Sequence, residues 1–111
     1  MSQGELRKLR DAAPLFAALG DATRLGLLAR LSKGGPGSIS RLSEKSSVSR
    51  QAITKHLEVL CDAGLVSSRR EGRERIWALA PERLADAHRY LEDVSKQWDA
   101  ALGRLRQFVE D

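Results

Sequence analysis

The spacing of apolar residues predicts a mainly α-helical chain with about five helices. LRKLRDAA and PLFAALG predict one helix over residues 6–20 that is broken or restarted at Pro14, because an interior proline removes a hydrogen bond and clashes with the preceding turn. Asp21 is placed to cap a second helix, which ends at the glycine pair 34–35. One face of this second helix is expected to carry Leu25, Leu28 and Leu31.

Two short helices joined by a tight turn are expected between about residues 38 and 63. The first, in SISRLSEKS, turns Ile39 and Leu42 inward. Ser49 caps the second, SRQAITKHLEVLCDAGLV. The expected buried positions of this second helix are Ala52, Ile53, Leu57, Leu60 and Cys61. Hydrogen-bond donors occupy the opposite side of its first turns: Arg50, Gln51, Thr54 and Lys55. Such side chains can read base edges in a DNA major groove, which admits one helix.

The stretch LVSSRREGRERIWALA, about residues 65–80, predicts a β-hairpin with a basic tip. Leu65-Val66 and Ile76-Trp77 flank a turn expected at Glu71-Gly72. Four basic residues gather around that turn: Arg69, Arg70, Arg73 and Arg75. Together with the two short helices, this hairpin predicts a winged helix-turn-helix, a mainly α fold with a small β-hairpin wing.

A long last helix is predicted over about residues 82–109, with apolar residues in a strict heptad pattern. We call these positions the seam: Leu84, Ala87, Leu91, Val94, Trp98, Ala101, Leu105 and Phe108. At about 1.5 Å per residue the helix is about 40 Å long, more than a small domain can cover. The seam is therefore expected to pack against the same helix of a second chain. The expected interface residues are Leu84, Leu91, Val94, Trp98, Ala101, Leu105 and Phe108.

Composition and charge narrow the function. A chain of 111 residues that is 41% hydrophobic fits one domain over residues 1–111. Residues 24–55 hold seven basic groups and one acidic group, so this segment has a net charge of +6, whereas the whole chain has +4. Such a segregated basic block is typical of nucleic-acid binding. The chain has one cysteine, no apolar run near the roughly 20 residues of a membrane span, and no signal peptide, so we expect a soluble, cytoplasmic protein.

Three segments in this order resemble the ArsR family of bacterial dimeric transcriptional repressors. They are FAALGDATRLGLLARL, SRQAITKHLEVLCDAGLV and RREGRERIWAL, which together cover about residues 15–80. Ser47 departs from the family pattern, which usually has glycine in this turn. The resemblance implies a homodimer that binds double-stranded DNA at an inverted-repeat operator. The expected DNA-contacting residues are Ser47, Ser49, Arg50, Gln51, Thr54, Lys55, Arg70 and Arg73.

Metal sensing is the best-known activity of that family, but its ligands are missing here. The thiolate motif of the arsenic and cadmium sensors falls on Ser38-Ile39-Ser40, and hydroxyls do not replace thiolates for soft metals. The Asp-x-His pair of the zinc sensors falls on Pro81 and Arg83. Asp86-Ala87-His88 has the right spacing, but its partner pair is absent downstream. We therefore expect no metal and no other cofactor.

Other interpretations remain open from sequence alone. The polar side of the second short helix is also what a solvated face looks like, although the basic hairpin favours DNA. His56 is expected to be packed or backbone-bonded, and Cys61 to be a small buried apolar residue. No phosphate loop, paired carboxylates or nucleophile constellation indicates an enzyme. The remaining candidates are a sequence-specific repressor, a non-specific architectural DNA-binding protein and a winged-helix protein-interaction module.

Overall fold

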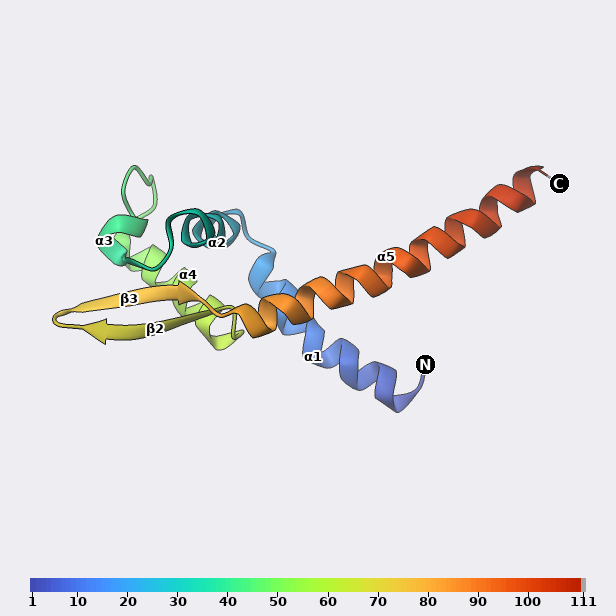
Figure 1. The fold of residues 1–111 in the computed structure, drawn as a ribbon, viewed down its shortest axis with the longest axis horizontal. Coiled ribbons are helices and arrows are strands. Elements are labelled where there is room, and N and C mark those ends of the chain that lie inside the picture. The colour runs from blue at the N-terminus through green and yellow to red at the C-terminus, as the bar shows by residue number, and fades with distance from the viewer. Residues whose placement is uncertain (111) are drawn as a thin grey trace.

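The structure, a computed structural model, describes residues 1–110 of the chain. It is elongated, 66 × 32 × 20 Å, because one long helix projects from a compact body (Figure 1). The elements in chain order are α1 (Gln3–Leu19), α2 (Ala22–Gly34), β1 (Gly37–Ser38), α3 (Ile39–Leu42), α4 (Arg50–Asp62), β2 (Val66–Glu71), β3 (Glu74–Leu79) and α5 (Pro81–Glu110). The three strands form an antiparallel sheet in the order β1-β3-β2. The predicted winged helix-turn-helix fold is thus confirmed.

Helix α1 runs without interruption through Pro14, so the expected break there is wrong. The carbonyl that loses its partner belongs to Arg10, four residues earlier. Both Arg10 and Pro14 are exposed, so water can bond that carbonyl and the helix continues. The helix also begins earlier than expected, because the Ser2 hydroxyl accepts a hydrogen bond from the Glu5 N–H at 3.1 Å.

Helix α2 begins after Asp21, whose carboxylate accepts the Arg24 backbone N–H at 3.0 Å, as expected of an N-cap. Its inward face differs from the expected one: Leu27 and Leu31 are buried and Leu28 packs at the edge of the core. Leu25 is 52% exposed, so its expected place on this face is wrong. In a helix of 3.6 residues per turn, side chains spaced three residues apart each time move progressively around the helix axis. Side chains spaced alternately by three and four residues stay on one face.

The hydrophobic core lies where α1, α2, α4 and the sheet meet. Its most buried members are Leu15, Leu42, Ile53, Leu57, Leu60, Leu65 and Trp77. Trp77 anchors the hairpin from β3, opposite Ser68 on β2 and Gly37 on β1. Strand β1 was not predicted, because two residues are too few to carry an alternating pattern. The hairpin turn is Gly72–Arg73, one residue later than expected, since Glu71 pairs with Glu74.

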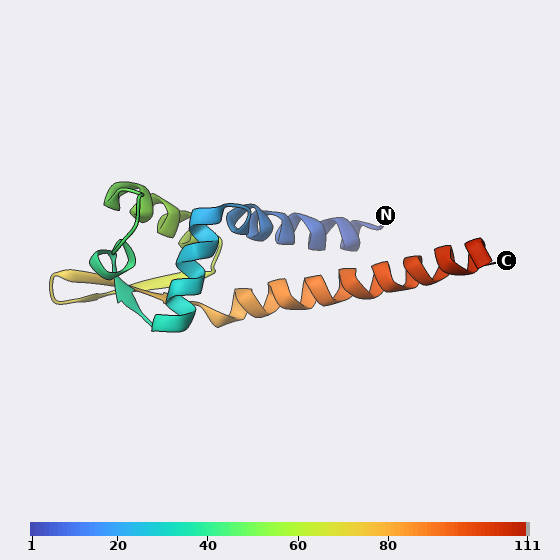
Figure 2. The same cartoon turned by 90° about the horizontal axis from the view of Figure 1, so that it is seen from above.

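Helix α5 leaves the body soon after it starts. The Phe16 and Tyr90 rings, 5.4 Å apart, join α1 to α5, and an Arg83 guanidinium N–H donates to the Asp11 carbonyl at 3.1 Å. Only Ala87 is fully buried among the described α5 residues. Both helices extend from the body toward the same side of the molecule (Figure 2). No helix within residues 1–110 is long and apolar enough to cross a membrane.

Candidate nucleic-acid interface

Helix α4, which we call the reading helix, has the two faces that its sequence predicts. The Ser49 hydroxyl caps it by accepting the Ala52 N–H at 3.2 Å. Its inward residues Ile53, Leu57 and Leu60 are fully buried, while Ala52 and Cys61 are half-buried. On the opposite side the candidate DNA-contacting residues are exposed or half-buried: Arg50, Gln51, Thr54 and Lys55. The buried face fixes the helix in place, so the polar face is held at the surface.

The side chains of that polar face are engaged to different degrees. An Arg50 guanidinium N–H donates to the Ser40 hydroxyl at 3.0 Å, which ties the start of the reading helix to α3. The Thr54 hydroxyl donates to the Arg50 carbonyl at 2.9 Å and keeps its oxygen available as an acceptor. Gln51 and Lys55 make no side-chain hydrogen bond within residues 1–110. They are therefore available to an external partner without any internal bond being broken.

The turn before the reading helix accommodates its unusual serine. Ser47 is exposed. Among the described residues, Lys45 is the non-glycine residue with positive φ, at 59°. The left-handed conformation of this turn therefore falls on Lys45, and Ser47 needs no glycine-like backbone. Ser47 remains a predicted DNA contact.

The wing is formed by β2 and β3 and carries four arginines, of which two have partners within the described residues. Arg69 forms an ion pair with Glu71, with a guanidinium nitrogen 2.8 Å from Oε1. Arg75 lies over the Trp77 ring at 4.5 Å and donates from Nε to the Ser68 hydroxyl at 2.9 Å.

The other two wing arginines, Arg70 and Arg73, are exposed, and neither forms an ion pair within the described chain. These two are the wing residues predicted to contact DNA. Arg69 finds its partner on its own strand and Arg75 finds one across the hairpin, so the sequence alone does not show which wing arginines are engaged.

The seam on α5 changes its surroundings along the helix. Leu84 packs against the core of its own chain and Ala87 is buried there. Val94 and Ala101 are half-buried. The other seam residues are largely exposed: Leu91 by 53%, Trp98 by 67%, Leu105 by 59% and Phe108 by 83%. Leu102 and Val109, which the heptad pattern missed, are also exposed and widen the apolar band.

The residues considered above as possible metal ligands have other partners. The Ser38 hydroxyl caps α3 by accepting the Arg41 N–H at 3.3 Å, and the Ser40 hydroxyl accepts from Arg50. The Asp86 carboxylate pairs with the guanidinium groups of both Arg83 and Arg89. His88 is exposed, 3.5 Å from a Glu92 oxygen. No cluster of three potential metal-ligating His, Cys, Asp or Glu side chains occurs within residues 1–110.

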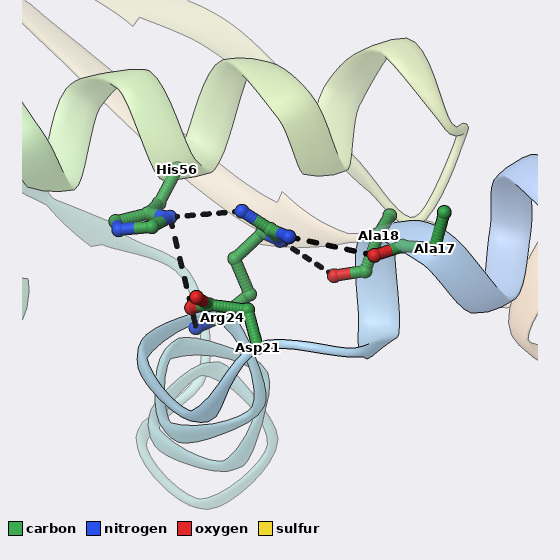
Figure 3. Close-up of polar contacts among 5 residues, drawn as sticks. All are labelled: Ala17, Ala18, Asp21, Arg24 and His56. Carbon is green, nitrogen blue, oxygen red and sulfur yellow. Dashed lines mark hydrogen bonds and ion pairs between the residues drawn. The ribbon is translucent and has the colours of Figure 1, made fainter.

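A polar cluster behind the reading helix was only partly foreseen. His56 is half-buried, and an Arg24 guanidinium N–H lies 3.1 Å from its Nδ1 (Figure 3). An Asp21 oxygen lies 3.8 Å from the same nitrogen. The hydrogen bond from the Arg24 backbone N–H lowers the pKa of Asp21 below its ordinary 3.8, burial opposes this, and the charge of Arg24 lowers the pKa further. The histidine is thus bonded to a side chain, where a packed or backbone-bonded ring was expected.

The chain runs from the short helix α3 through the capped reading helix to the basic wing. This arrangement defines a winged helix-turn-helix protein. A family described as a helix-turn-helix domain matches residues 19–69. The transcriptional regulator Rv2034 of Mycobacterium tuberculosis is 36% identical over 86% of this chain and 85% of its own length. The arsenical resistance operon repressor of Escherichia coli is 32% identical over 72% of this chain and 68% of its own length.

A solved structure is similar over nearly the whole chain. An ArsR-like transcriptional regulator from Rhodococcus sp. RHA1 superimposes with a TM-score of 0.74 and 38% identity, covering 90% of this chain and 93% of the other. The chain belongs to the ArsR family of winged helix-turn-helix transcriptional regulators. It is a DNA-binding regulator and not an enzyme.

Proposed function

We propose that this protein is a homodimeric, sequence-specific repressor that binds an inverted-repeat operator in the cytoplasm. The observation that carries this proposal is the presence of two different exposed surfaces on one folded chain. The reading helix and the wing present available donors on one part of the body, and α5 presents an uncovered apolar band. The first surface suits DNA, and the second suits a further copy of the chain.

The two DNA-contacting elements have different chemistry and therefore different roles. Gln51 and Thr54 can accept as well as donate hydrogen bonds, so they suit base edges in the major groove. Arg70 and Arg73 are fixed positive charges on a hairpin, so they suit phosphates, which position the protein without reading sequence.

Dimerisation follows from the apolar band on α5. Four seam residues from Leu91 to Phe108 are more than half exposed, and soluble monomers rarely leave such a continuous patch uncovered. In a two-fold dimer that pairs this helix with the same helix of the second copy, the two reading helices are expected to enter successive major grooves, about 34 Å apart. The operator is then an inverted repeat with half-site centres about 10 base pairs apart, or a multiple of that.

Metal independence is part of the proposal. Ser38 and Ser40 offer hydroxyls that are already engaged, and Asp86 is shared between two arginines. Cys61 is the one cysteine of the chain, and a single thiol does not rebuild a thiolate site for a soft metal. The donor set therefore does not fit the arsenic compounds that the arsenical resistance operon repressor is named for.

Footprinting in the presence of competitor DNA distinguishes the three candidate functions. A two-fold symmetric footprint that survives excess competitor supports the sequence-specific repressor. Binding that is lost with salt and shows no sequence preference indicates the architectural protein. No binding at low salt indicates the protein-interaction module, and either of these last two results contradicts the proposal.

A further inference from the structure

The Arg24 side chain joins three helices through one guanidinium group. Its Nε donates to the Ala18 carbonyl at 2.6 Å, and an Nη donates to the Ala17 carbonyl at 3.4 Å, both at the end of α1. The other Nη bonds to His56 Nδ1 on the reading helix at 3.1 Å (Figure 3). Arg24 itself stands in the first turn of α2. One side chain therefore connects the end of α1, the start of α2 and the middle of α4.

Each of these bonds has a specific requirement. The last carbonyls of a helix lack partners within the helix and lie at the negative end of its dipole. The guanidinium group donates hydrogen bonds to two of these carbonyls in α1 and places a positive charge beside them. Because guanidinium nitrogens only donate, this contact is a hydrogen bond when His56 Nδ1 accepts, as it does in the tautomer with the ring proton on Nε2. The contact needs an acceptor at the Nδ1 position, and a hydrophobic side chain of similar size does not provide one.

The connected helices belong to the two surfaces of the proposed function. Ala17 follows Phe16, whose ring packs on Tyr90 of α5. His56 lies two residues from Thr54, whose side chain is on the DNA-facing side of the same helix. Arg24 therefore links the reading helix α4 to α1, and α1 in turn packs on the dimerisation helix α5.

We propose that Arg24 and His56 are positioning residues that fix the reading helix relative to the dimerisation helix and so set the half-site spacing that the dimer accepts. This inference rests on the proposed function, because spacing has meaning only for a dimer on an inverted repeat. One added base pair moves a half-site by about 3.4 Å and rotates it by about 35°. A rigidly held reading helix rejects such a change, whereas one released from α1 tolerates it better.

Three variants test the contact. His56→Leu removes the acceptor while keeping side-chain volume and raising helix propensity. The matched control His56→Asn restores an acceptor close to the Nδ1 position, because an asparagine amide oxygen occupies nearly the same place. Arg24→Lys keeps the positive charge and removes the fork that reaches both helices. Circular dichroism and sedimentation equilibrium check that each variant is folded and dimeric.

The measurement is the ratio of affinities for two sets of duplexes. One is the inverted repeat selected from random duplexes by the wild-type protein, and the others have one or two base pairs added to or removed from its spacer. We expect His56→Leu and Arg24→Lys to lower this ratio by about tenfold, the value of one charge-assisted hydrogen bond. His56→Asn should keep the wild-type ratio. In all three variants the affinity for a single half-site should change by less than about twofold, which is the usual size of the effect of a surface substitution.

The outcomes separate this inference from the function on which it rests. A wild-type protein with no preference for an inverted repeat contradicts the proposed function and this inference with it. A wild-type protein that discriminates spacers, with folded His56→Leu and Arg24→Lys variants that discriminate equally well, overturns the positioning role alone. Equal loosening by His56→Asn and His56→Leu also overturns it, because the acceptor would then be irrelevant.

Discussion

Replacing Trp98 with glutamate should convert the dimer to monomer and abolish operator binding without touching a DNA-contacting residue. Trp98 lies in the middle of the seam and is 67% exposed in the single chain. A tryptophan can bury up to about 250 Å², so about 170 Å² per chain remains for a partner to cover. At about 25 cal/mol per Å², covering it contributes about 4 kcal/mol per chain.

The size of the effect follows from two copies of that contact. Only part of this burial energy appears as binding free energy, because the ordering of side chains and the desolvation of polar groups oppose association. If half is realised, the loss is about 4 kcal/mol per dimer, which raises the dimer dissociation constant about a thousandfold. The buried carboxylate adds to this, since it faces an apolar partner without a counter-charge.

Ala100→Glu is the matched control. Ala100 is exposed on the same part of α5 and lies about 200° around the helix from Trp98. It adds the same charge away from the seam, so both the dimer and operator affinity should be preserved. Sedimentation equilibrium gives the association state, and titration of the selected operator gives the affinity. A Trp98→Glu protein that is still dimeric at micromolar concentration and binds with unchanged affinity would refute the assignment of the seam.

Three further predictions test other parts of the account. Gln51→Ala or Thr54→Ala should weaken operator binding more than binding to a scrambled duplex, whereas Arg73→Ala should weaken both and reduce the salt slope by about one; equal losses on both duplexes for all three contradict these roles. Operator affinity should be the same in chelator and in micromolar zinc, cadmium or arsenite, and release by one or two ions per dimer would reveal a missed site. Because the folded state lowers the pKa of Asp21, its carboxylate stabilises the fold above its ordinary pKa of 3.8 and loses this effect as pH falls through the lower folded value. Thermal melts should therefore show a smaller loss of stability between pH 6 and 3 in Asp21→Asn than in the wild type, and identical losses would contradict this.

Local signals in the sequence predicted most of the fold. Asp21 and Ser49 both act as the helix caps that their side chains indicate, because an N-cap depends on bonds only three residues away. The two faces of α4 were also predictable, since Ile53, Leu57 and Leu60 follow the helical period. The wing was predictable from the apolar pairs that flank its glycine turn, although strand register placed the turn one residue later.

Features that depend on tertiary contacts were predicted less well. Leu25 and Leu27 are equally apolar; Leu27 shares a face with Leu31, and the core contacts that face and leaves Leu25 exposed. The Pro14 break was wrong because solvent can satisfy the carbonyl that the proline leaves without a donor. The contact between Arg24 and His56 joins residues 32 positions apart, and no periodic pattern in the sequence indicates such a pair.

Selection of bound duplexes from a random pool by the purified wild-type protein tests the central claim most directly. It reports sequence preference, symmetry and half-site spacing in one experiment. The account predicts recovery of an inverted repeat whose half-sites are centred about 10 base pairs apart or a multiple of that. Recovery of sequences with no shared motif, or of a single half-site without a symmetric partner, would contradict a dimer that reads DNA through two copies of α4.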